Sequence, residues 1–163
     1  MKRIIALAAV LIMVLSLTAC FGMPGNTNGS TADQANAADV STYKKDFEGL
    51  QKYITDRNNN STKQEILYNI VGASNGTRII LNGNSFVEIY DFGSTATKDS
   101  ADPEKAQDIL AAIKKDGKFR VMDGGTELTA VITKSGRYVI SWDASRAYDY
   151  EGKVATEELK NNW

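Results

Sequence analysis

The sequence predicts an α+β domain in which an antiparallel sheet of four or five strands packs against two or three helices. Three observations support this class. An apolar stripe at helical spacing begins near residue 40, a helix with start and stop signals follows residue 102, and short strand-like segments are separated by glycine-containing turns. The 163 residues allow one such domain plus appended segments.

The first helix is expected over residues 39–56, where apolar side chains recur at alternating spacings of three and four residues. This spacing places them along one face of a helix, which is typical of a packing face. The stripe consists of Val40, Tyr43, Phe47, Leu50 and Ile54. Gly49 costs about 1 kcal/mol relative to alanine inside a helix. We therefore interpret it as a point of close approach to a neighbouring segment.

A second helix is predicted over residues 63–71. Thr62 and Glu65 fit a Thr-x-x-Glu capping box, and Gly72 suits the position just beyond the last turn. The apolar face of this helix would consist of Ile66, Leu67, Ile70 and Val71. A strand through residues 66–71 is the alternative, because a short apolar run fits either structure.

The segments 77–81 and 84–92 flank Asn82-Gly83 and predict a hairpin, because Asn-Gly tolerates the positive φ angles of a tight turn. A third helix follows over residues 102–115. Asp102 caps its first turn, Pro103 occupies that turn, and two lysines precede Gly117 at its end.

Three further strands are expected over residues 118–122, 127–133 and 137–142, joined by turns at 124–125 and 134–136. The two hairpin regions share a weak similarity. Asn75-Gly76-Thr77 opens the first, Gly124-Gly125-Thr126 opens the second, and each region follows a predicted helix. This similarity is either a duplication of a helix–hairpin unit or the ordinary recurrence of turn residues.

The N-terminus carries a targeting signal. Met1-Lys2-Arg3 is basic, and residues 4–17 are apolar except for Ser16, which is too short for a membrane-spanning helix of about 20 residues. The segment then ends in Leu17-Thr18-Ala19-Cys20. This stretch resembles the lipobox of bacterial lipoproteins at all four positions.

The resemblance implies that a lipid is attached to the sulfur of Cys20 and that the chain is cleaved after Ala19. Residues 1–19 are then a signal peptide, and residues 20–38 are a lipidated cysteine and flexible tether. Residues 39–163 are the extracytoplasmic domain of a membrane-anchored protein, because multiple acyl chains give stable anchoring. The Gly-, Asn- and Ser-rich composition of residues 22–38 also indicates a flexible linker.

The lipobox, the tether and the Asp102-Pro103 helix between hairpins are together similar to small lipoproteins of Gram-positive bacteria. More loosely, the helix-plus-sheet order resembles units of the β-lactamase-inhibitor-protein type. The second resemblance concerns architecture alone and implies no function.

Composition excludes several kinds of site. The chain has no histidine and one cysteine, so Ser–His and Cys–His pairs, disulfides and thiolate zinc sites cannot form within it. The net charge of −1 gives no reason to expect nucleic acid as a partner. No carboxylate pair has a spacing that singles it out for hydrolysis, and no cofactor motif is present. We therefore expect neither an enzyme nor a bound cofactor or metal.

Four aromatic residues are the candidate binding residues: Phe86, Tyr90, Tyr138 and Trp142. In alternating strands they would form an exposed platform if the helices covered only the other face of the sheet, and Arg78, Arg120 and Arg137 could flank it. The alternative is that these rings are the core under the helices.

We expect a lipid-anchored, non-catalytic module that binds an envelope protein, glycan or peptide. The alternatives are a structural or assembly subunit of an envelope complex and a small hydrolase.

Overall fold

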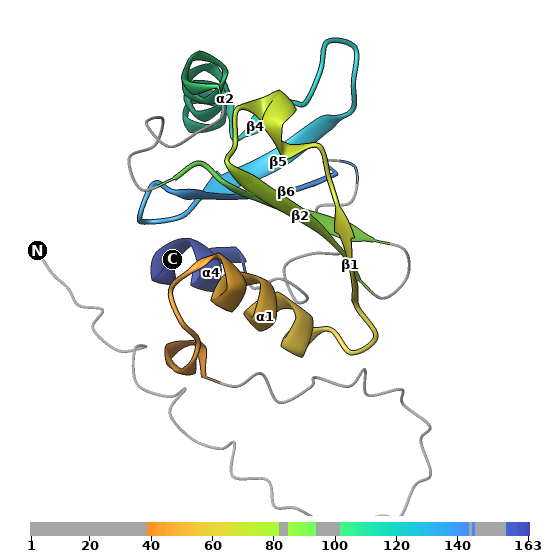
Figure 1. Cartoon of the computed structure of the whole chain (residues 1–163), viewed down its shortest axis with the longest axis vertical. Helices are drawn as coiled ribbons and strands as arrows, with labels where there is room; N and C mark the ends of the chain where they lie inside the picture. Colours follow the sequence, from red (N-terminus) through yellow and green to blue (C-terminus); the bar gives the residue numbers. More distant parts are fainter. Residues whose placement is uncertain (1–38, 82–84, 94–101, 144, 146–155) are drawn as a thin grey trace, which may run out of the picture. The chain divides into compact units, whose positions relative to one another are not determined.

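The computed structural model describes residues 39–81, 85–93, 102–143, 145 and 156–163. They form an antiparallel sheet of six strands in the order β1-β2-β3-β6-β5-β4, together with three α-helices (Figure 1). The predicted α+β class and the antiparallel sheet are confirmed, whereas the predicted number of strands was too low. The predictions for the signal peptide, Cys20, the tether and the Asn82-Gly83 turn lie outside the described residues.

The elements from β2 to β6 follow the predicted order, whereas a strand and a 3-10 helix replace the predicted second helix and a C-terminal helix is added. The strands are β1 Thr62–Glu65, β2 Asn75–Ile80, β3 Phe86–Asp91, β4 Lys118–Arg120, β5 Glu127–Ile132 and β6 Tyr138–Asp143. The α-helices are α1 Phe47–Arg57, α2 Pro103–Asp116 and α4 Thr156–Asn162, and two short 3-10 helices are η1 Val40–Thr42 and η2 Tyr68–Val71. Helix α2 agrees closely with its prediction, since Asp102 Oδ1 accepts a hydrogen bond from the Lys105 N–H at 3.1 Å and Gly117 ends the helix at φ +66°.

The first helix begins at Phe47 rather than near Asp39, so its predicted start was wrong. Asp39 caps only the short η1, and Asp46 caps α1 by accepting a hydrogen bond from the Gly49 N–H at 2.7 Å. The chain between the two helices passes very close to α1. A Cβ atom at Gly49 would lie 1.9 Å from the backbone oxygen of Lys44, so Gly49 is indeed a point of close approach.

The predicted helix at 63–71 is absent from this described stretch, and its strand alternative is also wrong. Thr62 pairs with Ile80 and Glu65 with Thr77, which makes β1 an edge strand of the sheet instead of the start of a capped helix. The apolar residues that follow form η2, which ends at Gly72 in the left-handed region at φ +76°. Backbone pairing with β2 therefore replaces the local capping preference, and β1 is the sixth strand.

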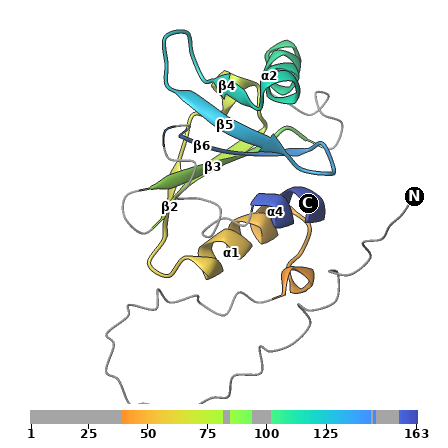
Figure 2. The same ribbon diagram turned by 180° about the vertical axis from the view of Figure 1, so that it is seen from behind.

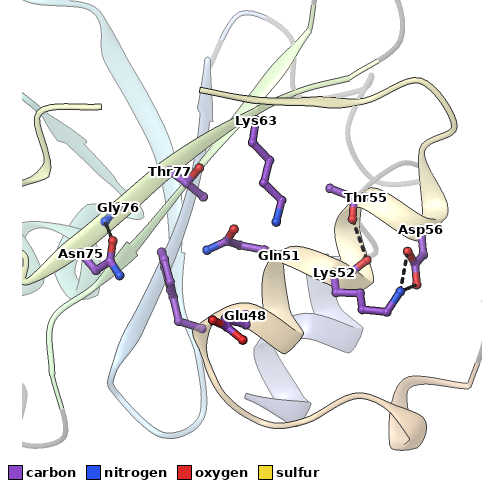
Figure 3. Close-up of a pocket in the computed structure, with 10 residues that line it drawn as sticks. Glu48, Gln51, Lys52, Thr55, Asp56, Lys63, Asn75, Gly76 and Thr77 are labelled. Carbon is purple, nitrogen blue, oxygen red and sulfur yellow. Dashed lines mark hydrogen bonds and ion pairs between the residues drawn. The ribbon is translucent and has the colours of Figure 1, made fainter. Parts of the chain in front are cut away.

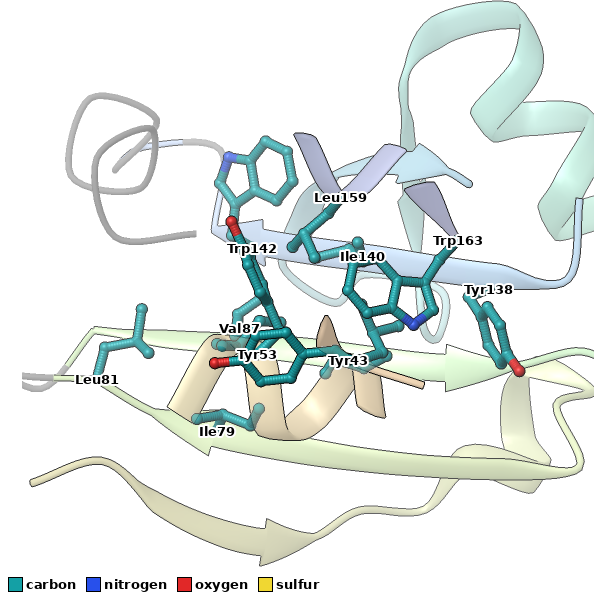
Figure 4. Close-up of a cluster of buried hydrophobic side chains, with 13 residues drawn as sticks. Tyr43, Tyr53, Ile79, Leu81, Val87, Tyr138, Ile140, Trp142, Leu159 and Trp163 are labelled. Carbon is teal, nitrogen blue, oxygen red and sulfur yellow. The ribbon is translucent and has the colours of Figure 1, made fainter. Parts of the chain in front are cut away.

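Helices cover both faces of the sheet, so the fold has three layers. Figures 1 and 2 show α2 on one side, with α1 and α4 on the other. The core under α1 and α4 contains Tyr43, Leu50, Tyr53, Ile54, Ile79, Leu81, Val87, Ile89, Tyr138, Ile140, Trp142, Leu159 and Trp163 (Figure 4). The core under α2 contains Val71, Ala73, Tyr90, Phe92, Ala106, Ile109, Leu110, Ile113, Phe119, Leu128, Ala130 and Val139.

The C-terminal helix α4 was not anticipated from the sequence, and it ties three parts of the domain together. The backbone oxygen of Trp163 accepts a hydrogen bond from the Ser135 N–H at 2.8 Å, and the Trp163 indole donates to the Asp46 oxygen at 3.2 Å. The Trp163 ring also lies 5.5 Å from the Tyr53 ring. Trp163 thereby joins the start of α1, its middle and the β5–β6 turn.

The similarity between the two hairpin regions extends to strand order but not to the helices. The order β1-β2-β3 is mirrored by β6-β5-β4, and the central strands β3 and β6 are antiparallel. A two-fold rotation axis that exchanged β3 with its antiparallel neighbour β6 would be perpendicular to the sheet. Such a rotation does not exchange the two faces of the sheet, so it would require both helices to lie on the same face. Because α1 and α2 lie on opposite faces, no such axis relates them.

Candidate functional site

The four predicted aromatic residues lie on two opposite faces of the sheet. Tyr138 and Trp142 belong to the core under α1, whereas Tyr90 belongs to the core under α2. Their exposed fractions are 3%, 7% and 2% respectively, and Phe86 is half-buried. The expectation of one exposed aromatic platform is therefore corrected, because helices cover both faces instead of one.

The three arginines predicted to flank that platform are engaged in separate contacts. Arg78 forms an ion pair with Glu88, Arg137 with Asp91, and Arg120 with Glu127. Only Arg78 and its partner lie beside a surface hollow with apolar walls. That hollow is the strongest candidate site in the described part of the chain.

Exposed apolar side chains gather at one place. Leu67, Met122 and Ile70 are 73%, 61% and 38% exposed, and they are the exposed large hydrophobic residues of the described chain. All three line one hollow of about 510 Å³, which we call the apolar groove. Among the described residues, its lining is Glu65, Ile66, Leu67, Ile70, Arg78, Phe86, Glu88, Tyr90, Val121, Met122, Gly125, Thr126, Leu128 and Asp143.

The first wall of the apolar groove is η2 with the residues just before it. It lies tightly on β2 because Gly76 has no side chain. A Cβ atom there would lie 2.5 Å from Cβ of Tyr68. At its far end, Gly72 sits equally close to α2, where a Cβ atom would lie 2.4 Å from the Asp102 oxygen. These two contacts fix the wall and leave Leu67 and Ile70 directed away from the two cores.

The second wall is the β4–β5 turn, which carries Met122. The Gly125 N–H donates to the Met122 oxygen at 3.0 Å, and Gly124 adopts φ +72°, a conformation that favours glycine. The Arg120 guanidinium donates to the Gly125 oxygen at 2.6 Å. These contacts hold the turn in a defined shape and leave the Met122 side chain in solvent.

The floor between the walls contains a buried polar network. The Glu88 Oε1 atom accepts from Arg78 Nε at 3.0 Å and from Arg78 Nη2 at 2.5 Å. Its Oε2 atom accepts from the Tyr90 hydroxyl at 2.7 Å. Burial, with the nearby Glu88 charge, raises the pKa of Tyr90. The carboxylate of Glu88 is thus satisfied on both oxygens, as a buried charge requires.

A second hollow of about 540 Å³ lies between α1 and the β1–β2 edge (Figure 3). Lys63 extends from β1 toward Gln51 on α1, and Lys52 pairs with Asp56 at 2.8 Å. We call this hollow the polar cleft. Among the described residues its charged lining is balanced, with Lys52 and Lys63 beside Glu48 and Asp56, and none of the exposed large apolar residues of that set lines it.

The sequence contained a partial signal for the apolar groove. The apolar spacing places Leu67 and Ile70 on the apolar face of a predicted helix, and Met122 at the end of a predicted strand. Met122 directly precedes Asp123-Gly124-Gly125, a turn in which a large apolar side chain has little to pack against. The grouping of Leu67, Ile70 and Met122 depends on which part of the sheet α2 leaves uncovered. Local sequence patterns cannot predict this.

No protein-family model, curated protein or solved structure matches this chain. Within the described residues, no group of three or more side chains of the metal-binding types converges. The helices of that same part are all too short or too polar to cross a bilayer.

Proposed function

We propose that this protein is a lipid-anchored, extracytoplasmic binding module, and that the apolar groove of domain 39–163 takes a protein or peptide segment with apolar side chains. Attachment is through the acylated sulfur of Cys20, with residues 20–38 as the tether. The role is binding rather than catalysis.

One observation carries the proposal. All the exposed large hydrophobic residues of the described chain line a single hollow. Water contact with apolar surface costs about 25 cal/mol per Å², so an exposed apolar cluster with polar surroundings usually marks a docking surface. The groove also has fixed walls and a hydrogen-bonded floor, which reduces the ordering cost of binding.

The chemistry of the floor favours binding over catalysis. A general acid or base must exchange a proton with a substrate within hydrogen-bond reach. Glu88 already accepts hydrogen bonds on both oxygens, and only 4% of the residue is exposed. Its carboxylate therefore orders Arg78 and Tyr90 instead of facing a substrate.

A defined peptide tests the groove. The full chain in lipid nanodiscs would be titrated into a fluorescein-labelled peptide, Gly-Ser-Leu-Leu-Ser-Gly, with fluorescence anisotropy as the measurement and empty nanodiscs as the blank. The double variant Leu67→Ser, Met122→Ser should weaken binding at least tenfold, which corresponds to about 1.4 kcal/mol. Gln51→Ser in the polar cleft is the matched control and should bind like the parent chain. Equal binding by the double variant, or no peptide binding by the parent chain, would contradict the proposal.

The anchor is tested separately. Cys20→Ala removes the acceptor sulfur, so the chain should stay unprocessed and take up no labelled fatty acid. If the variant is still cleaved and retained at the membrane like the parent chain, Cys20 is not the attachment point.

A further inference from the structure

Strand β1 leaves one side of its backbone unpaired. In the described chain it pairs with β2 alone at the edge of the sheet, and all four of its side chains are exposed. A second strand can add to such an edge unless proline, a bulge or charged side chains prevent it. Residues 62–65 contain no proline and pair with β2 residue for residue, without a bulge. The protection of this edge therefore depends on its two charges, Lys63 and Glu65.

These two charges are opposite in sign. Because successive side chains of a strand alternate, Lys63 and Glu65 share one face of the sheet, and Gln64 between them belongs to the other face. Each of the two charged side chains is exposed. An edge with one cation and one anion on the same face is complementary to a copy of itself that runs in the opposite direction.

The neighbouring charges leave both side chains without a partner. No salt bridge of the described residues includes Lys63 or Glu65. Glu48 lines the polar cleft with Lys63, but no ion pair joins these two residues (Figure 3). Two ion pairs beside β1 are balanced internally: Arg78 with Glu88, and Lys52 with Asp56. A second strand is therefore able to supply partners for both charges of β1.

The charges select one register for the pairing of two copies of β1. A two-fold axis that exchanges antiparallel neighbours is perpendicular to the sheet and keeps each side chain on its face, so one residue of β1 lies on the axis. Two registers give the longest overlap within the strand. With Lys63 on the axis, two ammonium groups are directly opposite each other, which destabilises a sheet. With Gln64 on the axis, Lys63 of each copy is opposite Glu65 of the other.

The opposite edge of the sheet lacks this complementarity. Strand β4 carries Lys118 and Arg120 on one face, and both pair with the single carboxylate of Glu127. Any two-fold pairing of β4 with itself would place two cations directly opposite each other. Its charges therefore protect β4 against a second copy, whereas those of β1 do not.

We propose that two copies of this chain associate through β1, with Gln64 on the two-fold axis and Lys63 of each copy paired with Glu65 of the other. The two sheets then form one continuous antiparallel sheet. Because the rotation does not exchange its faces, the apolar grooves of both copies lie on the same face. The contact is small, so the association is weak and depends on the local concentration of the chain. This inference does not depend on the proposed binding function.

A cysteine on the axis tests the register. In Gln64→Cys the two new residues are directly opposite, with Cα atoms about 4.5–5.5 Å apart, a separation that a disulfide spans. In Thr62→Cys, on the same face, they are offset by about 13 Å along the strands. The full chain in phosphatidylcholine vesicles would be oxidised with copper phenanthroline in air and separated by non-reducing electrophoresis.

We expect a covalent dimer from Gln64→Cys, at about five times the yield from Thr62→Cys. The parent chain, whose one cysteine is Cys20, is the blank. Equal yields from the two variants, or a yield from Gln64→Cys no higher than the blank, would refute pairing in this register.

A charge swap in the Gln64→Cys chain tests the two ion pairs. Lys63→Glu and Glu65→Lys each place like charges opposite each other twice, so each should lower the dimer yield about tenfold. The two changes together restore both pairs and should return the yield to that of Gln64→Cys alone. This rescue also controls for folding, because a chain that had lost β1 would not regain the dimer.

Lys115→Glu is the matched control, since it reverses an exposed charge on α2 and should leave the yield unchanged. An equal loss in Lys115→Glu and Lys63→Glu would mean a long-range charge effect and would refute the proposed pairs. Full yield in either single variant of β1, or no rescue in the double variant, would refute them as well.

Discussion

Replacing Gly49 by alanine separates the effect of helix propensity from that of tertiary packing, because the two predict opposite signs for the change in the free energy of unfolding. Propensity alone predicts that Gly49→Ala stabilises α1 by about 1 kcal/mol. In the structure, however, the new Cβ atom would lie 1.9 Å from the Lys44 oxygen and 2.8 Å from the Lys44 carbonyl carbon. Both are backbone atoms, so no side-chain rotation relieves the overlap.

The loss in the free energy of unfolding follows from the displacement of the segment around Lys44. An ordinary contact needs the Lys44 oxygen to withdraw by roughly 1.5 Å, which displaces the segment that carries Tyr43 and Asp46. The Asp46 cap on α1 would weaken, at a cost of about 1 kcal/mol. Tyr43, which is 8% exposed and donates to Asp56 at 2.9 Å, would lose part of its packing, at a further cost of about 2 kcal/mol. After subtraction of the propensity gain, we expect a net loss of about 2 kcal/mol.

The assay is urea unfolding of the full chain, followed by the fluorescence of Trp142 and Trp163, with a thermal scan beside it. For a domain of roughly 125 residues, 2 kcal/mol corresponds to a fall in melting temperature of about 8 °C. Gln51→Ala in the same helix is the control and should change the free energy of unfolding by less than about 0.5 kcal/mol. A Gly49→Ala chain that is as stable as the parent, or more stable, would refute the close approach of residue 44 to α1.

Three further predictions concern other parts of the fold. Trp163→Ala should lower the free energy of unfolding by about 3 kcal/mol in the same urea assay, since it removes a buried ring; an unchanged midpoint would mean that α4 does not stabilise the α1 core. Burial and the hydrogen bond to Glu158 raise the pKa of Tyr53 to about 12, and burial with the Glu88 charge raises that of Tyr90. Their protonated forms therefore stabilise the fold fully below the unfolded pKa of about 10, and this contribution is lost as the pH rises through the folded values. Tyrosinate absorbance during alkaline titration should show a late, unfolding-linked phase, and complete ionisation near pH 10 would contradict it. Gly76→Ala should push η2 off β2 and weaken leucine-peptide binding about tenfold, whereas parent-like affinity would show that η2 does not shape the groove.

Local sequence signals predicted an element correctly where they mark both its start and its end. Helix α2 has an aspartate cap, a proline in its first turn and a glycine at its end, and all three act as predicted. The first helix was placed too early because Asp39 and Asp46 are both suitable caps, and the apolar spacing continues across the break between them. In the structure the backbone is extended at Tyr43 and Asp46, and the segment between them lies against Gly49. This close approach depends on the fold and not on the local pattern.

Thr62 and Glu65 show a different limit. The same residues satisfy a capping box and an edge strand, and the choice depends on pairing with β2 about 15 residues further along the chain. The predicted aromatic binding residues show the same limit. Alternation correctly placed Tyr138 and Trp142 on one face, but it does not report which faces the helices cover. The exposure of Leu67 and Met122 is likewise a property of the area that α2 leaves open.

The sharing of two cores by the central strands has a consequence for local dynamics. Strands β3 and β6 supply alternate side chains to both cores, so neither core can open without disrupting the other. Amide hydrogens in β3 should therefore exchange only through global unfolding, whereas those of η2 and of the β4–β5 turn should exchange through local opening, which costs less free energy. The floor of the apolar groove should then keep its shape until the whole domain unfolds, and its two walls, which are fixed in the native state, should open only in brief local fluctuations.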